Sequence, residues 1–261
     1  MMIRVASWNV RGLARPAAQL NFLGRQGADL LLLQDVTEHA ADAVRNSGCW
    51  HSVLRSRHDG GRQRAGCLIA AGNGWDLGVS DAVAGVPDAE RTLTATARHG
   101  DLTLTVACCY APTNTGRSAT DRPAFFTAVA AWLAAAPTPL LLGMDANGPR
   151  VDHPDLMHNV WWSPEEEQVL GASAVTCDAL RLWFDGHPEQ LALRRRYYPH
   201  GPLADSYHRG RRGRFLRCRY DSIRVSPGIR PLSVRYFYDE AVAAGSDHAL
   251  VIAELELPPA P

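Results

Sequence analysis

The sequence predicts a layered α/β or α+β fold. Predicted strands outnumber predicted helices along the 261 residues, and they are interspersed without a strict strand–helix–strand rhythm. Hydrophobic residues make up 46% of the chain, so a sizeable core can form, and no repeat or linker divides the sequence. We therefore expect a single domain over residues 1–257, followed by a short tail over residues 258–261.

The first half of the chain alternates strands and helices. Strands are predicted from β-branched or leucine-rich apolar runs, and helices from apolar residues that recur with helical spacing. The Gly60-Gly61 and His99–Asp101 turns indicate two hairpins, and Thr37 is a predicted helix cap. The predicted strands are Ile3–Asn9, Asp29–Gln34, His51–Arg57, Gly66–Ala71, Arg91–Arg98 and Leu102–Tyr110, and the helices are Pro16–Gln26 and His39–Ser47.

The second half begins with a long helix and ends in strands. Asp121 is the predicted cap of a helix from Pro123 to Ala136, and residues 148–207 are less regular. The remaining predicted strands are Pro139–Met144, Cys218–Val225, Leu232–Phe237 and Leu250–Leu257, and the remaining helices are Glu165–Leu170 and Ala179–Phe184.

Carboxylates, amides and a histidine lie at the ends of several predicted strands. Strand ends are where layered α/β proteins present reactive side chains, and oxygen ligands of this kind suit Mg²⁺ or Mn²⁺. A histidine beside an aspartate can supply positive charge to a phosphoryl oxygen. The pattern therefore predicts metal-assisted hydrolysis of a phosphoester. The residues are Asn9, Gln34, Asp35, Asp145, Asn147, Asp247 and His248.

Six short motifs span residues 7 to 248. They are Ser-Trp-Asn-Val-Arg-Gly-Leu at 7–13, Leu-Gln-Asp at 33–35, Tyr-Ala-Pro-Thr-Asn at 110–114, Gly-Met-Asp-Ala-Asn at 143–147, Arg-Tyr-Asp-Ser-Ile at 219–223 and Ser-Asp-His at 246–248. In this order they resemble the motifs of the endonuclease/exonuclease/phosphatase superfamily. The resemblance implies a four-layer sandwich, in which two mixed β-sheets pack face to face and helices cover their outer faces.

The resemblance also implies a metal site. Asn9 and Asp35 would hold Mg²⁺ (or Mn²⁺), with Asp247 nearby. Asp35 stands where the superfamily has glutamate, so its carboxylate is one methylene closer to the backbone. Either the metal shifts toward it or a water molecule intervenes, and the preference can move toward Mn²⁺.

The catalytic roles that the resemblance implies fall on five residues. Asp145 would activate or orient the attacking water, and Asn147 would hold the phosphate or that water. His248 would contact the scissile phosphate, while Asp221 would fix its ring and favour the imidazolium. Tyr110 would donate to a phosphate oxygen.

Substrate contacts are expected around this catalytic group. Arg11 and Asn114 belong to the first and third motifs, and Arg150 follows the fourth. Tyr110 stands where pancreatic-type deoxyribonucleases and sphingomyelinases carry a histidine. The chain therefore resembles the abasic-site and retrotransposon endonucleases more closely than the pancreatic type.

A basic segment adjoins the predicted site. Between residues 194 and 219 the sequence has nine arginines and a single acid, whereas the formal net charge of the whole chain is zero. Concentrated arginine is typical of a surface that binds a phosphate-rich substrate; a solvated loop in an arginine-rich protein is the alternative. The members expected to contact substrate are Arg194, Arg195, Arg196 and Arg219.

Three functions are compatible with these features. The first is a nuclease, with DNA or RNA as partner. The second is a phosphatase or phosphodiesterase of a nucleotide or sugar phosphate, which the zero net charge and the long segment between Asn147 and Asp221 favour. The third is a non-catalytic binding module, which only the substitution at Asp35 supports. We expect a monomer.

The cysteines and the N-terminus indicate the cellular compartment of the protein. The six cysteines lack metal-ligand or disulfide-framework spacing, which fits reduced thiols. The first residues lead directly into a predicted strand, without the pattern of a secretory signal, and no apolar run is long enough to cross a bilayer. We therefore expect a cytoplasmic protein that does not bind membranes.

Overall fold

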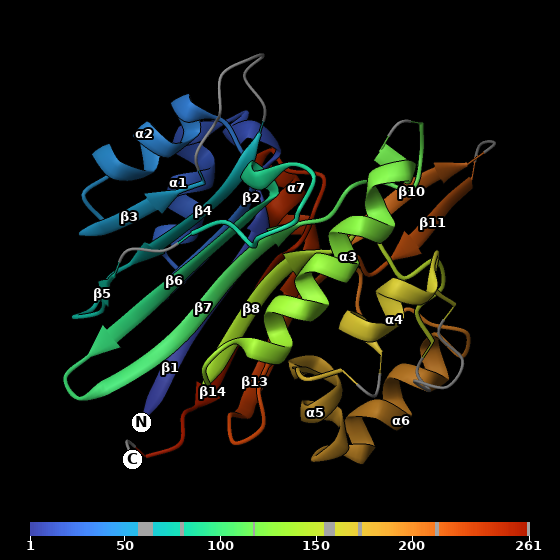
Figure 1. Ribbon diagram of the computed structural model, residues 1–261. Coiled ribbons are helices and arrows are strands. Elements are labelled where there is room, and N and C mark those ends of the chain that lie inside the picture. The colour runs from blue at the N-terminus through green and yellow to red at the C-terminus, as the bar shows by residue number, and fades with distance from the viewer. Residues whose placement is uncertain are drawn as a thin grey trace.

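The computed structural model describes residues 1–56, 65–78, 81–116, 118–153, 160–171, 174–211 and 214–259. These residues form two six-stranded β-sheets, a separate two-stranded hairpin, and helices on the outside (Figure 1). The predicted Gly60-Gly61 turn lies outside the described residues. Within the described residues, no helix is both long and apolar enough to cross a membrane.

The first sheet contains strands from both ends of the chain. Its central strand β1 pairs in parallel with β2 and antiparallel with β14, so this sheet is mixed. In spatial order its strands are β13 (Arg230–Phe237), β14 (Leu250–Glu256), β1 (Met2–Asn9), β2 (Leu30–Val36), β4 (Gly66–Ala71) and β3 (Ser52–Arg55).

The second sheet is also mixed. Strand β7 pairs in parallel with β8, and β8 pairs antiparallel with β12. In spatial order its strands are β5 (Asp76–Leu77), β6 (Thr92–His99), β7 (Leu102–Tyr110), β8 (Leu140–Asp145), β12 (Asp221–Val225) and β9 (Cys177–Asp178).

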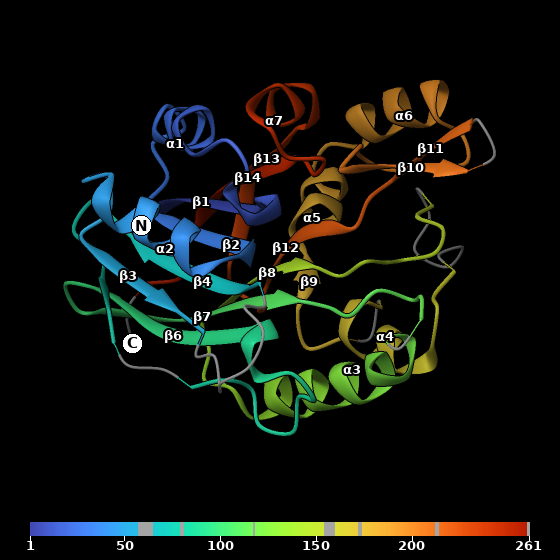
Figure 2. The same cartoon turned by 90° about the horizontal axis from the view of Figure 1, so that it is seen from above.

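Helices cover both sheets from outside, which gives four layers (Figure 2). α1 (Pro16–Gly24), α2 (Glu38–Asn46) and α7 (Tyr238–Ala244) pack on the outer face of the first sheet. α3 (Ser118–Ala135) and α4 (Pro164–Leu170) pack on the second. The faces that meet between the sheets carry apolar residues such as Val5 and Leu32 on one side and Val106 and Leu141 on the other. The predicted four-layer sandwich is confirmed.

The remaining elements lie at the edges of the sandwich. α5 (Ala179–Asp185) packs against β12 and β13, and α6 (Pro188–Tyr197) follows it. The hairpin of β10 (Tyr207–Arg211) and β11 (Arg214–Cys218) forms a sheet of its own. Single 3₁₀ turns occur at Arg11–Leu13 and Ala89–Arg91.

Two predicted elements have a boundary that differs from the observed one by more than two residues. Helix α3 begins at Ser118, ahead of the predicted cap Asp121, and includes Pro123. Its early turn is anchored by the buried Arg122, which donates to the carbonyls of Pro112 and Ala146 and pairs with Glu166. This anchoring offsets the backbone hydrogen bond that a proline removes.

The predicted strand Cys218–Val225 is in fact interrupted. Cys218 ends β11, Asp221 begins β12, and Arg219 and Tyr220 lie between the two strands. The Oγ of Ser206 accepts hydrogen bonds from the backbone N–H groups of Tyr220 and Asp221, at 2.7 Å and 3.2 Å. A side chain therefore takes the place of a neighbouring strand at this point.

Gly143 allows the two sheets to approach closely beneath the strand ends. A Cβ atom at this position of β8 would lie 2.6 Å from Leu32 Cδ1 and 2.8 Å from Ser7 Oγ. We expect Gly143→Ala to lower the free energy of unfolding by about 1–3 kcal/mol, measured by denaturant titration. The matched control is Gly24→Ala, because a Cβ there meets nothing within 4 Å. Equal stability of the two variants would contradict this account of the interface.

Candidate active site

A cleft of about 420 Å³ opens where strands of both sheets end. Asn9 ends β1, Tyr110 ends β7 and Asp145 ends β8, so the strand ends meet at one edge, as layered α/β folds allow. The residues that line the cleft are Asn9, Arg11, Asp35, Tyr110, Thr113, Asn114, Thr115, Asp145, Asn147, Trp162, Tyr207, Arg209, Tyr220, Asp247 and His248.

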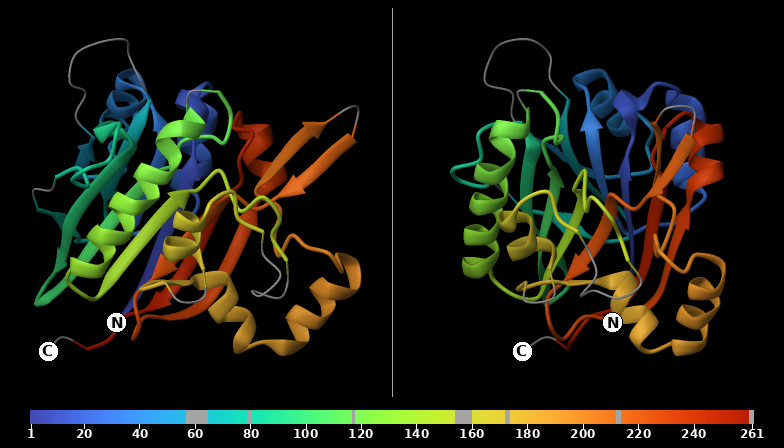
Figure 3. Two further views of the ribbon diagram at one scale, coloured as in Figure 1. Left: turned by 45° about the vertical axis from the view of Figure 1, so that its right-hand side comes forward. Right: turned by 90° about the vertical axis from the view of Figure 1, so that its right-hand side faces the viewer.

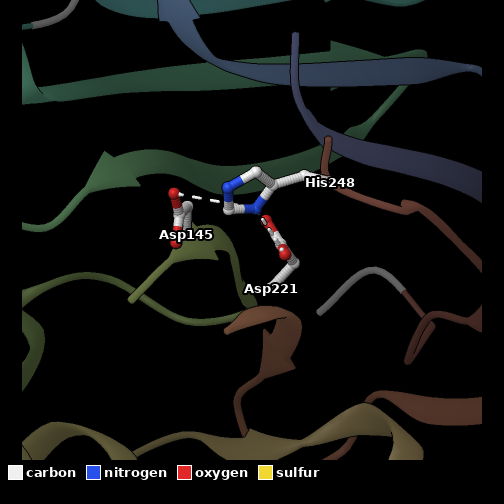
Figure 4. A group of neighbouring side chains, drawn as sticks. All are labelled: Asp145, Asp221 and His248. Carbon is white, nitrogen blue, oxygen red and sulfur yellow. Dashed lines mark hydrogen bonds and ion pairs between the residues drawn. The ribbon is translucent and has the colours of Figure 1, made fainter. Parts of the chain in front are cut away.

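Asp145, Asp221 and His248 form a buried group at the inner end of the cleft (Figure 4). His248 Nδ1 lies 2.9 Å from Asp221 Oδ2 and 4.0 Å from Asp145 Oδ2. Asp145 and Asp221 are direct partners in the register of β8 and β12, which explains how residues 76 positions apart in the chain meet. The second ring nitrogen of His248 lies on the far side of the ring from Asp221.

The charge of His248 follows from its neighbours. Burial alone would lower the pKa of His248, but the nearby carboxylates of Asp221 and Asp145 outweigh it and raise that pKa to about 10. The ring is therefore an imidazolium at neutral pH. Nδ1 donates to Asp221, and Nε2 also carries a proton that it can offer to an anion in the cleft.

Asp145 is held by two donors and has a perturbed pKa. Its Oδ2 accepts from Asn9 Nδ2 at 2.8 Å, and its Oδ1 accepts from the backbone N–H of Asn147 at 2.9 Å. Burial raises the pKa of Asp145 to about 6, with a further increase from the Asp221 charge, although His248 and the two donors oppose it. A carboxylate with a pKa near neutrality is suited to general-base chemistry.

The backbone around His248 is tied to β1. Ser246 Oγ donates to the carbonyl of Asn9 at 2.6 Å and accepts from the N–H of His248 at 3.1 Å. Trp8 Nε1 donates to the carbonyl of His248 at 2.9 Å. The serine of the Ser-Asp-His motif therefore acts through position, because it joins the histidine to the strand that ends in Asn9.

The oxygen donors for a metal line the same cleft as His248. Asp35 and Asp247 line it, and within the described part of the chain no hydrogen bond or ion pair engages either carboxylate. Burial raises the pKa of Asp35, and the charges of Asp145 and Asp247 raise it further. Asn9 adds an amide oxygen, which accepts from the Arg11 N–H at 3.0 Å. Two carboxylates and an amide, all oxygen donors, fit a hard divalent cation.

The other predicted cleft residues are also in place. Burial raises the pKa of Tyr110, so its hydroxyl remains a donor, and the Arg91 guanidinium lies 4.8 Å from its ring centroid. Asn147 adopts a left-handed φ of 46° and donates through Nδ2 to the carbonyl of Ala111 at 2.9 Å. Arg11 and Asn114 line the cleft as well. These positions agree with the roles that the motifs imply, and the roles themselves stay predictions.

Arg219 does not face the cleft. Its side chain is buried, and its guanidinium donates to Asp152 Oδ2 at 2.9 Å and to Asp178 Oδ2 at 2.6 Å. The motif position correctly placed it next to Asp221, but two buried carboxylates occupy its donors. The expectation that Arg219 contacts substrate is therefore not supported by its position, which is that of an anchor beneath the site.

The other predicted basic contacts lie outside the cleft. Arg150 lies 5.9 Å from the Trp162 ring centroid, and Trp162 is a cleft residue, so Arg150 is at the rim. Arg194 lies 3.8 Å from the ring centroid of Tyr198. Arg195 and Arg196 are exposed on the last turn of α6.

Six cleft residues were not predicted as site residues. They are Thr113, Thr115, Trp162, Tyr207, Arg209 and Tyr220. Tyr220 lies within the Arg-Tyr-Asp-Ser-Ile motif, and Thr113 within the Tyr-Ala-Pro-Thr-Asn motif, so motif membership was the available signal. Arg209 was counted only as one of the nine arginines of the basic segment, because the sequence alone does not show that β10 leads into the cleft.

Comparison with known proteins gives matches only at the level of structure. No family model matches the chain, and no curated protein matches it in sequence. TDP2 from D. rerio, complexed with single strand DNA product, is 16% identical over 98% of this chain and 99% of its own, with a TM-score of 0.69.

Two further solved structures match over similar lengths. An endonuclease/exonuclease/phosphatase from Bacteroides vulgatus is 14% identical over 98% of this chain and 99% of its own, with a TM-score of 0.69. The human Nocturnin catalytic domain with bound sulfate anion is 15% identical over 98% and 93%, with a TM-score of 0.63. The chain therefore has the endonuclease/exonuclease/phosphatase fold that its motifs indicated.

Proposed function

We propose that this chain is a divalent-metal-dependent phosphodiesterase, and specifically a nuclease that acts on DNA or RNA. The observation that carries the proposal is the His248–Asp221 pair beside Asp145, in a cleft where no hydrogen bond or ion pair from another described residue engages the carboxylates of Asp35 and Asp247. A cationic donor, a carboxylate base and a set of oxygen ligands would then surround one volume. Hydrolysis of a phosphodiester needs these three kinds of group together.

Each residue then has a defined task. Asp145 accepts the proton of the attacking water, since its pKa of about 6 leaves it ionised above that pH. His248 offers Nε2–H to a phosphoryl oxygen, and Asp221 holds its ring. Tyr110 and Asn147 add neutral donors from the cleft wall. Asn9, Asp35 and Asp247 would hold Mg²⁺ (or Mn²⁺), which supplies positive charge to the phosphate when bound.

Two observations favour nucleic acid as the substrate. The solved structure of the fold neighbour from D. rerio holds a single strand DNA product. Arg209 lines the cleft of this chain together with the aromatic rings of Tyr207 and Tyr220. Cationic and aromatic side chains side by side are typical of surfaces that bind single strands. The abasic-site and retrotransposon type of endonuclease stays the predicted subtype.

A small phosphorylated molecule is the second candidate substrate. A cleft of about 420 Å³ is within the range of small-molecule sites, and Trp162 encloses one side of it. The third possibility, a non-catalytic module, has less support, because Asn9, Asp145, Asn147 and His248 all line the same cleft.

The test of the proposed function is nicking of supercoiled plasmid by the purified protein. We expect nicking in Mg²⁺ or Mn²⁺ and none in excess EDTA, because the ligand set requires a hard cation. Absence of nicking in both metals, with turnover of a nucleotide or sugar phosphate, would favour the small-substrate alternative. Absence of metal-dependent turnover on every phosphoester tested would favour the non-catalytic module.

The exposed arginines of α6 distinguish the two substrate classes. If Arg195 and Arg196 contact phosphates, their double replacement by glutamine lowers the slope of log Kd against log salt by about 0.7 per lost contact on single strands. Binding of a fluorescent oligonucleotide across a salt series measures this slope. Arg45→Gln is the control. Arg45 pairs with Asp42 on α2, which packs on the outer face of the first sheet. An unchanged slope would remove these arginines from the substrate surface.

A further inference from the structure

The root of the β10–β11 hairpin, which is the segment Ser206-Tyr207, is joined to the His248–Asp221 pair through the backbone. The hairpin extends from the body of the molecule (the orange strands at the upper right of the left panel of Figure 3). Its first residue, Tyr207, forms an isolated antiparallel bridge with His248. The carbonyl of Ser206 accepts from the N–H of Ala249 at 2.8 Å. The residues on either side of this bridge are therefore fixed relative to His248.

The same root also holds Asp221. Ser206 is fully buried, and its Oγ accepts from the Asp221 N–H at 3.2 Å as well as from the Tyr220 N–H. Tyr236 adds a hydrogen bond from its hydroxyl to the Asp221 carbonyl at 2.8 Å. The two-residue segment Ser206-Tyr207 thus contacts both members of the His248–Asp221 pair.

The ring of Tyr207 lies against the ring of His248. Their centroids are 4.8 Å apart and their planes are tilted by 32°, while Tyr220 stacks with Tyr207 at 5.4 Å and 22°. On the next residue of the hairpin, the His208 ring lies 4.0 Å from the ring of Tyr238.

The ring contacts of Tyr207 complement the hydrogen bond from His248 to Asp221. A single hydrogen bond at Nδ1 fixes one atom of the imidazole but leaves the ring free to tilt about that atom. A packed aromatic neighbour restricts this tilt, which directs Nε2. Tyr207 supplies such a neighbour, and Tyr220 stacks with Tyr207 in turn.

We propose that Tyr207 is a positioning residue, whose ring holds the His248 imidazole in the orientation that presents Nε2 to the phosphate. The assignment rests on the proposed function and extends it to a residue outside the six motifs. The part of Tyr207 that matters is its ring, because the hydrogen bonds at the hairpin root involve the backbone and Ser206. Tyr207→Phe is therefore expected to behave as the native protein, and Tyr207→Leu is not.

The experiment compares kcat and KM of these two variants on bis(p-nitrophenyl) phosphate, with saturating Mg²⁺ or Mn²⁺. This small diester lacks the neighbouring nucleotides of a strand, so it reports the chemical step with few additional contacts. We expect Tyr207→Leu to lower kcat by about tenfold with little change in KM, as for a misplaced catalytic group, and Tyr207→Phe to retain most of kcat. Tyr198→Leu is the matched control, because Tyr198 contacts Arg194 and Arg217 and does not line the cleft.

Two outcomes would overturn the positioning role. A rise in KM with unchanged kcat in Tyr207→Leu would make Tyr207 a substrate contact, and native values for both constants would leave it without a role in turnover. If Tyr207→Leu does not fold, Tyr207→Met takes its place, since it fills more of the volume without a ring.

A second measurement does not depend on turnover. The His248 ring protons of the native protein should show the ring-current shift of a stacked tyrosine in ¹H NMR. This shift should persist in Tyr207→Phe and disappear in Tyr207→Leu. If the native protein hydrolyses no phosphoester but shows this pattern, the proposed function fails while the contact stands. If the shift is absent from the native protein, the positioning role fails whatever the activity.

Discussion

His248→Gln is expected to lower turnover by about 10³-fold, which is the scale of a lost acid–base and electrostatic group. Glutamine is polar and similar in length, but it carries no charge and cannot replace the imidazolium that Asp221 and Asp145 stabilise. The loss should therefore appear in kcat, because the cationic donor matters most when charge builds on the phosphoryl oxygens. Plasmid nicking and hydrolysis of bis(p-nitrophenyl) phosphate measure it on two unrelated substrates.

A stability measurement separates this effect from misfolding. The folded-state pKa of His248 is raised from 6.5 to about 10. The ion pair therefore contributes its full stability below about pH 6.5, and that contribution is lost as the pH rises through about 10. The stability gap between the native protein and His248→Gln should narrow from pH 6 towards pH 10. His208→Gln is the matched control, since His208 does not line the cleft. Native turnover in His248→Gln would refute the site assignment.

The sequence predicted which polar side chains share the cleft because most of them lie at or next to strand ends. Asn9, Tyr110 and Asp145 end β1, β7 and β8, and a buried strand fixes where its last residue points. Two parallel pairings then bring these ends to one edge, so motif order along the chain translates directly into a shared site. Alternating and fully apolar runs predicted a layered α/β or α+β fold, whereas the four-layer arrangement was implied by the resemblance of the motifs.

Residues between Asn147 and Asp221 were harder to interpret, because their partners are distant in sequence. Arg219 was expected at the substrate as part of a dense arginine run, but Asp152 and Asp178 neutralise it from 67 and 41 positions away. Charge density along a sequence does not reveal which charges find a buried partner after folding. Arg195 and Arg196, in contrast, remain exposed, as a solvated basic surface requires.

The hairpin β10–β11 and helix α7 were not predicted for a related reason. The β10 sequence Tyr-His-Arg-Gly-Arg has little apolar alternation, and a two-stranded sheet apart from the core lacks the buried face that produces it. Helix α7 has only seven residues and follows directly on β13, so it is too short to show a clear helical periodicity. Tyr207 belongs to this hairpin, so its contact with His248 was beyond sequence reasoning.

The acid limb of the pH profile is the second large effect, and it reports the state of Asp145. Burial raises the pKa of this carboxyl from 3.8 to about 6, and only the ionised form can accept a proton from water. Activity should therefore fall tenfold per pH unit below about pH 6. On the alkaline side it should decline only as His248 loses its proton near pH 10. Initial rates on bis(p-nitrophenyl) phosphate at constant ionic strength and saturating metal would trace both limbs.

Asp145→Asn tests the general base directly, because asparagine keeps the shape of the side chain and removes its basicity. We expect a loss of about 10²–10⁴-fold in kcat, the range for a general base, and no acid limb in the residual activity. The neighbouring Asp35→Asn distinguishes a base from a ligand: its activity should recover at higher metal concentration, whereas that of Asp145→Asn should not. Recovery of Asp145→Asn by added metal would move Asp145 into the ligand set. An acid limb near pH 4 in the native protein would contradict the buried environment that two strand ends create for this carboxylate.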